Sequence, residues 1–254
     1  MEDKDRKADR YFMEVVEMDL QTLLAPIPGE NAYGISASHD ESYRRIRHER
    51  EDEDPSLPLG PWERELKRAN WVAASDLAAK ALATRSKDLQ LAVWLFEALI
   101  ARSGFQSLAP CLHLIDQLFR RFGSHLHPHD SEHRVNLLLW VNQKLLSPLR
   151  KVQITATGGE NNYAWNDWEQ AQRNEQLRAS LGKQAQAEIE GATLTDVGAA
   201  LACTSYERIA FLQTCLSDGQ TALKTLEKTV DEVLHGDGPG FGAMRGLLER
   251  IEVV

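Results

Sequence analysis

Residues 86–101, SKDLQLAVWLFEALIA, are the stretch that most constrains the fold. After its first three residues, only Gln90 and Glu97 interrupt a run of apolar side chains. A helix that is apolar on nearly every side must be surrounded by other elements. It is also too short to span a membrane, which requires about 20 predominantly apolar residues. The stretch therefore predicts a buried central helix, at about residues 86–102, in an all-α protein.

The polar start of this helix has a specific interpretation. Ser86 is predicted to be the N-cap, because a serine oxygen accepts a hydrogen bond from an N–H of the first turn. Asp88 would then lie in that turn, where its charge suits the positive end of the helix dipole. Trp94 in this helix, and Trp71 in the helical pattern before it, fall on apolar faces and are expected in the core.

The region before the central helix alternates helical patterns with turns. Residues 1–10 are highly charged and are expected to form a frayed tail, whereas residues 11–24 have the apolar spacing of an amphipathic helix. Pro26, Pro28 and Gly29 follow in the sequence PIPG. Because proline excludes regular helix and glycine permits unusual backbone angles, these residues predict an ordered chain reversal.

A loop of sequence TATGGENN divides the chain near residue 157 into two predicted units. Residues 1–157 form an antiparallel helical bundle around the central helix, with one short plausible strand at 151–154. Residues 158–254 form a second, smaller helical segment with a long helix at about 205–234. Short connections favour antiparallel neighbours in such a protein. The long helix either packs back on its own chain or pairs with a second copy, and in the second case the protein is a homo-oligomer.

Composition narrows the classes of function. The 254 residues carry a formal charge of −9 at pH 7, which argues against binding of nucleic acid, because phosphates require a basic surface. The three cysteines lack the CxxC spacing of metal and redox sites and are typical of a reducing compartment. The charged N-terminus lacks the apolar stretch of a signal peptide. We therefore expect a cytoplasmic protein without direct membrane insertion.

A turn of sequence GSHLHPHDSEH contains the weak candidates for a metal site, which are His125, His127, His129 and His133. Imidazole is a common ligand of transition metals, so a metal-binding enzyme or sensor is the alternative of a different class. Against it, Pro128 interrupts the geometry and no cysteine joins the set. The chain also lacks HExxH, GxSxG and phosphate-loop motifs. We expect no catalytic residues, no bound metal and no cofactor.

Three aromatic residues lie close together after the TATGGENN loop. Tyr163, Trp165 and Trp168 belong to a helical stretch that is otherwise polar. They either fix the second segment onto the first or form an exposed anchor for a partner, because aromatic side chains are enriched in the hot spots of interfaces.

Several of these pieces occur together in a definite order between about Leu20 and about Leu149. They are LLAPIPGENAYG, YRRIRHERED, the tryptophan at position 71, SKDLQLAVWLFEALIARSGFQSL and SHLHPHDSEHR. In this order they resemble the ImpA-type N-terminal domain of the TssA family of bacterial type VI secretion systems. The residues that match its motifs, and for which we expect structural roles, are Pro26, Pro28, Gly29, Trp71, Ser86, Lys87, Asp88 and Trp94.

The resemblance implies a non-enzymatic assembly or scaffold component. Proteins of this family coordinate tube and sheath assembly at the baseplate and membrane complex, and some relatives instead cap or stop the distal end of the sheath. The implied partners are baseplate, sheath, tube and membrane-complex proteins. The implied location is the bacterial cytoplasm, with recruitment to the secretion complex anchored in the inner membrane. Nothing like the family's ring-forming C-terminal region follows, so we expect an N-terminal fragment or a short variant.

Overall fold

The computed structural model describes residues 2–36, 38, 40–53, 66–159, 162–180 and 190–253. Within these ranges every regular element is a helix, and β-type pairing is limited to isolated bridges. The all-α fold class is therefore confirmed. The strand predicted at 151–154 is wrong, because Gln153 forms a single antiparallel bridge with Ala164 rather than part of a ladder.

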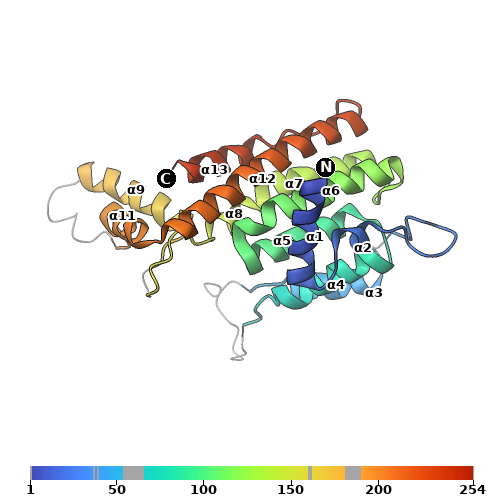
Figure 1. Cartoon of the computed structure of the whole chain (residues 1–254), viewed down its shortest axis with the longest axis horizontal. Helices are drawn as coiled ribbons and strands as arrows, with labels where there is room; N and C mark the ends of the chain where they lie inside the picture. The colour runs from blue at the N-terminus through green and yellow to red at the C-terminus, as the bar shows by residue number, and fades with distance from the viewer. Residues whose placement is uncertain are drawn as a thin grey trace, which may run out of the picture.

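Figure 1 shows the helices packed into an elongated bundle in which α12 runs across much of the view with α13 beside it. Two short 3₁₀ helices, η2 (Gly104–Ser107) and η3 (Gly123–His125), lie before and after α6. The α-helices are α1 (Glu2–Val16), α2 (Leu20–Leu24), α3 (Glu41–Glu49), α4 (Trp71–Thr84), α5 (Leu89–Ser103), α6 (Leu108–Phe122), α7 (Ser131–Lys144), α8 (Leu146–Arg150), α9 (Trp165–Ser180), α11 (Leu194–Cys203), α12 (Tyr206–Val233) and α13 (Gly242–Glu252).

Helix α5 is the buried central helix that the sequence predicts. It packs against α4, α6, α7 and α8, and every apolar side chain from Leu89 to Ile100 is buried. The predicted N-cap is wrong, however. The cap is Asp88, whose carboxylate accepts a hydrogen bond from the backbone N–H of Gln90 at 2.8 Å. Ser86 lies in an extended segment before the helix, and its buried hydroxyl has no hydrogen-bond partner among the described residues.

The N-terminal residues are helical rather than frayed. Helix α1 begins at Glu2 and packs on α6, with Tyr11 and Phe12 buried at the contact. Two contacts join its charged first half to neighbouring helices: Lys7 Nζ lies 3.0 Å from Asp218 Oδ2 of α12, and His113 Nε2 of α6 lies 2.6 Å from Asp5 Oδ1. The helix ends before Glu17, whose φ is 56°, and α2 begins after the N-cap Asp19, so the single helix predicted at 11–24 is also wrong.

Helix α12 packs along α6 of its own chain, which is one of the two arrangements that its apolar spacing permits. Gly219 makes this approach close, since a Cβ atom there would lie 3.0 Å from the Cβ of Leu108. The hydrophobic core continues from Ala8 on α1 to Ile251 on α13. The division of the chain near residue 157 stays a prediction.

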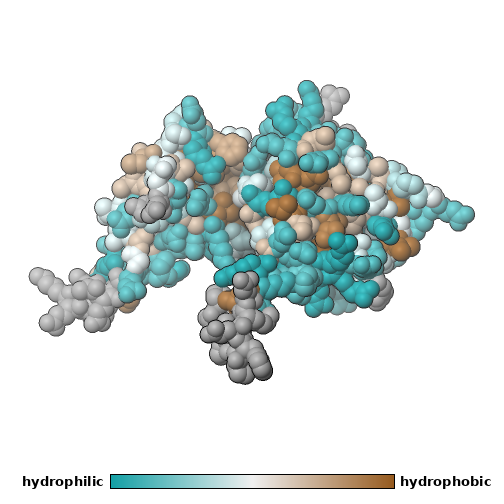
Figure 2. Space-filling model, turned by 90° about the horizontal axis from the view of Figure 1, so that it is seen from below, coloured by the Kyte–Doolittle hydropathy of each residue, from teal (hydrophilic) through white to brown (hydrophobic). Residues whose placement is uncertain are grey.

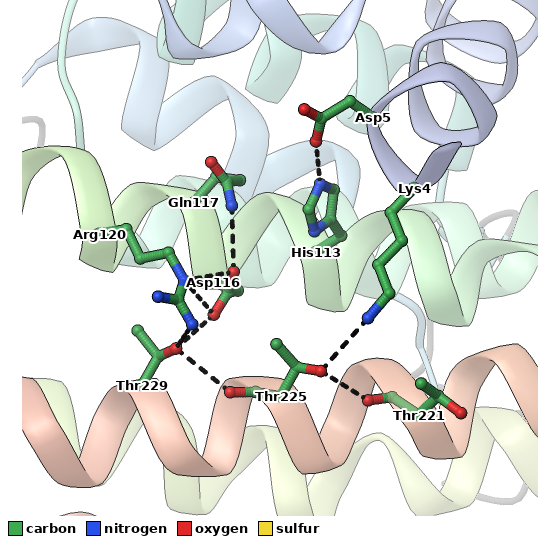
Figure 3. Close-up of polar contacts among 9 residues, drawn as sticks. All are labelled: Lys4, Asp5, His113, Asp116, Gln117, Arg120, Thr221, Thr225 and Thr229. Atoms are coloured by element: carbon green, nitrogen blue, oxygen red, sulfur yellow. Dashed lines mark hydrogen bonds and ion pairs between the residues drawn. The ribbon is translucent and has the colours of Figure 1, made fainter. Parts of the chain in front are cut away.

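A buried carboxylate joins α6 to α12. Asp116 is 2% exposed, and Thr229 of α12 donates a hydrogen bond to its Oδ1 at 2.6 Å. Arg120 Nε donates to Asp116 Oδ2 at 2.9 Å, and the Gln117 amide donates to the same oxygen at 3.1 Å. Figure 3 shows these side chains converging between the two helices. The burial of Asp116 is thus compensated by a charge partner and by neutral donors.

The described helices also bear on membrane insertion. Among them, none combines the length and the hydrophobicity that a membrane span requires.

Candidate functional site

The segments that carry the family-like motifs meet around the start of α5. Lys87 N donates a hydrogen bond to Tyr33 O at 2.9 Å, His127 N donates to Lys87 O at 2.9 Å, and Leu89 N donates to His127 O at 2.7 Å. The short segment before α5 is therefore held between two turns that are distant in sequence. We call this region the motif junction, and it comprises residues 23–34, 86–89 and 122–134.

Lys87 is the most unusual side chain of the motif junction because it is wholly buried. Its Nζ donates to Leu23 O at 2.8 Å and to Leu82 O at 2.6 Å. These carbonyls belong to the last turns of α2 and α4, where backbone acceptors lack helical partners and the helix dipole favours a cation. Burial, together with repulsion from Arg121, lowers the pKa of Lys87 to about 8. The ammonium thus caps two helices at once.

The histidine-containing turn is shaped by a buried arginine on α7. Arg134 is 4% exposed, and its guanidinium donates hydrogen bonds only to backbone carbonyls among the contacts described. The acceptors are Pro128 O at 2.6 Å, Ser124 O at 2.9 Å, His129 O at 3.0 Å and Gly123 O at 3.2 Å. One side chain therefore binds both ends of the turn.

The four histidines of this turn do not converge on one point, although the rings of His127 and His129 are in contact, with 4.3 Å between centroids. The ring of His125 stacks on Tyr33, with 4.3 Å between centroids and 4° between planes. His127 is buried, and its Nε2 lies 3.2 Å from Gly34 O. His129 and His133 are exposed. Across the described residues, no three His, Cys, Asp or Glu side chains are arranged to hold a metal ion, so the geometry offers no support for the alternative metal site.

The PIPG turn forms the chain reversal that the sequence predicts. Ile27 N donates to Ala32 O at 2.9 Å, and Gly29 has a φ of 121°, which favours glycine. Pro26 and Pro28 are exposed, whereas Ile27 between them is buried. The turn therefore presents its prolines to solvent and anchors itself by one apolar side chain.

A second polar cluster lies further along α5, around Glu97. Arg50 pairs with Glu97, and its guanidinium carbon lies 4.7 Å from the ring centroid of Trp94 and 5.9 Å from that of Trp140. Burial raises the pKa of Glu97, whereas the charge and hydrogen bond of Arg50 lower it. The sequence contains a signal for such a pair, because a carboxylate inside an apolar helix needs a cation. It does not identify Arg50 among the many arginines nearby.

Trp71 begins α4 and is half-buried. Together with Glu97 and Arg102 it borders a shallow hollow of about 710 Å³. This predicted core residue therefore lies at the edge of the core rather than inside it.

The aromatic residues of the second segment mostly pack inward. Trp165 is wholly buried and stacks on Trp168, with 4.5 Å between ring centroids. Tyr163 pairs through its backbone, since its carbonyl accepts a hydrogen bond from Ile154 N at 2.9 Å. An exposed anchor is therefore wrong for Trp165, because no part of its ring is available. Tyr163 and Trp168 are half-buried, and a partner-binding role for them stays a prediction.

The surface carries apolar side chains and hollows that suit contact with other proteins. Figure 2 shows apolar residues exposed among hydrophilic ones on one face of the bundle. On the surface of α12, Phe211 is 42% exposed and lines a hollow. A hollow of about 330 Å³ lies where α1, α6 and α12 meet, and a smaller apolar one of about 120 Å³ lies between Phe105, Leu212 and their neighbours. Exposed aromatics beside hollows are typical of interaction surfaces.

Comparisons with known proteins agree with this architecture. Residues 24–143 match the family model described as ImpA, N-terminal, type VI secretion system. Among solved structures, the chain is similar to the N-terminal domain, including the conserved ImpA_N region, of the TssA component of the type VI secretion system from Burkholderia cenocepacia. The two are 28% identical with a TM-score of 0.81, over 92% of this chain and 91% of that chain. The search of curated proteins gave no significant match. The matched region contains nearly all of the motif junction, and the structural likeness extends well beyond it; residues 24–143 are therefore an ImpA-type N-terminal domain of type VI secretion systems, in a chain that is similar as a whole to the N-terminal domain of a TssA component.

Proposed function

We propose that this protein is a non-enzymatic scaffold of the type VI secretion apparatus, which binds other components and coordinates tube and sheath assembly. The observation that carries the proposal is the likeness to a TssA N-terminal domain across 92% of the chain. Among the residues that match the family motifs, Lys87 and Asp88 are buried and hold the fold together rather than face a partner. The surface is thereby left for partners.

The proposed partners are baseplate, sheath, tube and membrane-complex proteins. The proposed location is the bacterial cytoplasm, with recruitment to the secretion complex at the inner membrane. The acidic chain, with a formal charge of −9, suits protein contacts better than contacts with nucleic acid or an anionic lipid surface.

The direct test is a binding assay of the untagged protein against the purified baseplate, sheath, tube and membrane-complex subunits of the same bacterium. Light scattering on the free protein establishes its own oligomeric state in the same buffer. We expect saturable binding to at least one baseplate or membrane-complex subunit. Binding to assembled sheath ends alone would replace this role by that of a distal cap. Folded protein that binds no subunit would contradict the proposed function.

A further inference from the structure

A basic groove lies between three helices that are far apart in sequence. Helix α6 and the preceding η2 form its floor, and α1 and α12, which both pack on α6, form its walls. The hollow has a volume of about 330 Å³, which is large enough for one or two side chains of a partner. We use the name basic groove for this hollow, whose lining residues include Lys7, Arg10, Tyr11, Pro110, Phe211 and Cys215.

Each of the three helices contributes one small side chain to the lining of the groove. Ala8 on α1, Ala109 on α6 and Ala222 on α12 all line it. Positions three, four and seven residues apart share one face of a helix. Lys7 and Tyr11 on α1 fit this spacing, so each wall presents a single face to the hollow. The groove is thus a regular product of the packing of α1 and α12 on α6.

One end of the groove is closed by contacts between the walls. Lys7 Nζ lies 3.0 Å from Asp218 Oδ2, and Lys4 Nζ donates to Thr225 Oγ1 at 3.4 Å. Figure 3 shows Lys4 extending from α1 to Thr225 on α12. Arg10, one helical turn further along α1, has no hydrogen-bond or ion-pair partner in the part of the chain that the structure describes. A cationic side chain is therefore available beside the groove.

The charge of the groove differs in sign from that of the molecule. The chain carries a formal charge of −9, yet the acidic side chain of Asp218 is outnumbered in the groove lining by Lys4, Lys7 and Arg10. Phe211 stands beside these cations with 42% of its surface exposed. A positive rim around an apolar interior attracts a negatively charged segment and then desolvates an apolar side chain.

We propose that the basic groove binds an acidic segment of another protein of the secretion apparatus, with one apolar side chain of that segment inserted beside Phe211. The carboxylates of the segment pair with Arg10 and the neighbouring lysines. This inference rests on the proposed scaffold function and assigns a docking surface to it.

The test compares two groove variants with two matched controls in the binding assay against the purified secretion subunits. Arg10→Glu reverses the unpartnered charge of the groove, and Arg44→Glu makes the same change on the exposed face of α3. Phe211→Ser removes the apolar wall, and Tyr206→Ser removes a more exposed aromatic residue of the same helix outside the groove. Circular dichroism and thermal unfolding verify that all four variants fold.

We expect each groove variant to weaken binding of one subunit about tenfold, and each control to change it less than about twofold. Binding by the wild type should also weaken as the salt concentration rises, because the contact is electrostatic.

Equal affinity of the groove variants and the wild type would overturn the inference while leaving the scaffold function standing. A wild-type protein that binds no subunit would overturn both. Loss of self-association in the groove variants, with subunit binding intact, would assign the groove to a second copy of the chain and would also overturn the inference.

Discussion

The motif junction and the interface between α6 and α12 each bury a charged side chain, but they compensate it differently. Asp116 at the interface has a cationic partner, Arg120, and neutral donors. Lys87 at the motif junction has no carboxylate partner among its described contacts, and two helix-terminal carbonyls accept its hydrogen bonds. The comparison teaches that the ends of helices can take the place of a counter-ion when the chain brings two of them to one point.

Each region also contains one glycine at a close contact, and again the contacts differ. At Gly34 a Cβ atom would lie 2.0 Å from the backbone oxygen of Arg85, and φ is 71°. At Gly219 the nearest atoms belong to the side chain of Leu108. Backbone cannot move aside as a side chain can, so the motif junction should be the less tolerant of the two regions.

The largest effect is expected for Gly34→Ala. The new methyl group must displace the backbone of Arg85, and a non-glycine residue at this φ adds strain. We expect the free energy of unfolding to fall by about 3–5 kcal/mol, measured by urea denaturation. A fall below about 1 kcal/mol would show that the motif junction can open without cost to the rest of the fold.

A smaller but substantial loss is expected for Lys87→Met, which keeps the length of the side chain and removes its ammonium. The carbonyls of Leu23 and Leu82 then lose a buried donor. Relief from burying a charge offsets part of this loss, and we expect a net destabilisation of about 2 kcal/mol at pH 7. Unchanged stability would mean that the two helix ends do not need this cation.

The stability of the same variant should also differ from that of the wild type in its dependence on pH. The folded-state pKa of Lys87 is lowered to about 8 from an ordinary value of 10.5. At a pH between these two values the unfolded chain binds more protons than the folded chain, so the free energy of unfolding of the wild type rises with pH. The hydrogen bonds survive deprotonation, because the neutral amine of Lys87 still has two N–H donors for its two carbonyl acceptors. We expect the stability difference between wild type and Lys87→Met to grow by about 2 kcal/mol from pH 7 to pH 9.5. A difference independent of pH would show that Lys87 titrates like an exposed lysine.

A modest effect is expected for Gly219→Ala in the middle of α12. The added methyl group presses on the buried side chain of Leu108, while alanine favours the helix more than glycine does. These effects oppose each other and should leave a destabilisation of about 1 kcal/mol, visible in thermal unfolding. Stabilisation instead would show that α6 and α12 adjust their separation easily.

The smallest effect is expected for Ser86→Ala, since this buried hydroxyl has no hydrogen-bond partner in the part of the chain that the structure describes. The change should alter the free energy of unfolding by less than about 0.5 kcal/mol. Asp88→Ala serves as the comparison and should cost about 1 kcal/mol, because Asp88 is the observed N-cap of α5. If a denaturant titration showed a larger loss of stability for Ser86→Ala than for Asp88→Ala, Ser86 rather than Asp88 would be the N-cap of α5.

Much of the fold follows from patterns that are local in the sequence. The apolar run of α5 identifies the centre of the core, and the spacing of apolar residues identifies α12 almost to its ends, with Tyr206 and Val233 as its bounds. The PIPG turn is predicted for the right reason, because proline and glycine act on their own backbone. The family motifs add the identity of the domain.

The sequence-based predictions that are wrong concern features that depend on contacts with residues distant in the sequence. The charged first half of α1 carries few apolar side chains that would predict where it packs, and contacts of Asp5 with His113 and of Lys7 with Asp218 join it to α6 and α12. The cap of α5 shifts from Ser86 to Asp88 because bridges to Gly34 and His127 keep the preceding residues extended. No pattern within a short window contains this information.

The candidate interaction surface was beyond prediction for the same reason. The basic groove combines α1 with α12, and their facing residues, such as Lys7 and Asp218, are separated by 211 positions in the chain. Its cations are ordinary members of a charged helix when the sequence is read alone. Only the packing of both helices on α6 gathers them around one hollow.

The hydrogen bonds from Arg134 to the histidine-containing turn have a consequence for how the sequence can vary among homologues. All four acceptors in the turn are main-chain oxygens, and every residue type supplies such an oxygen. The path of the turn is thus encoded by a residue outside it. We expect homologues to vary at exposed positions such as Ser124 and His129 while retaining an arginine at position 134. The histidines that make this segment easy to recognise in the sequence are then not the residues that determine its conformation.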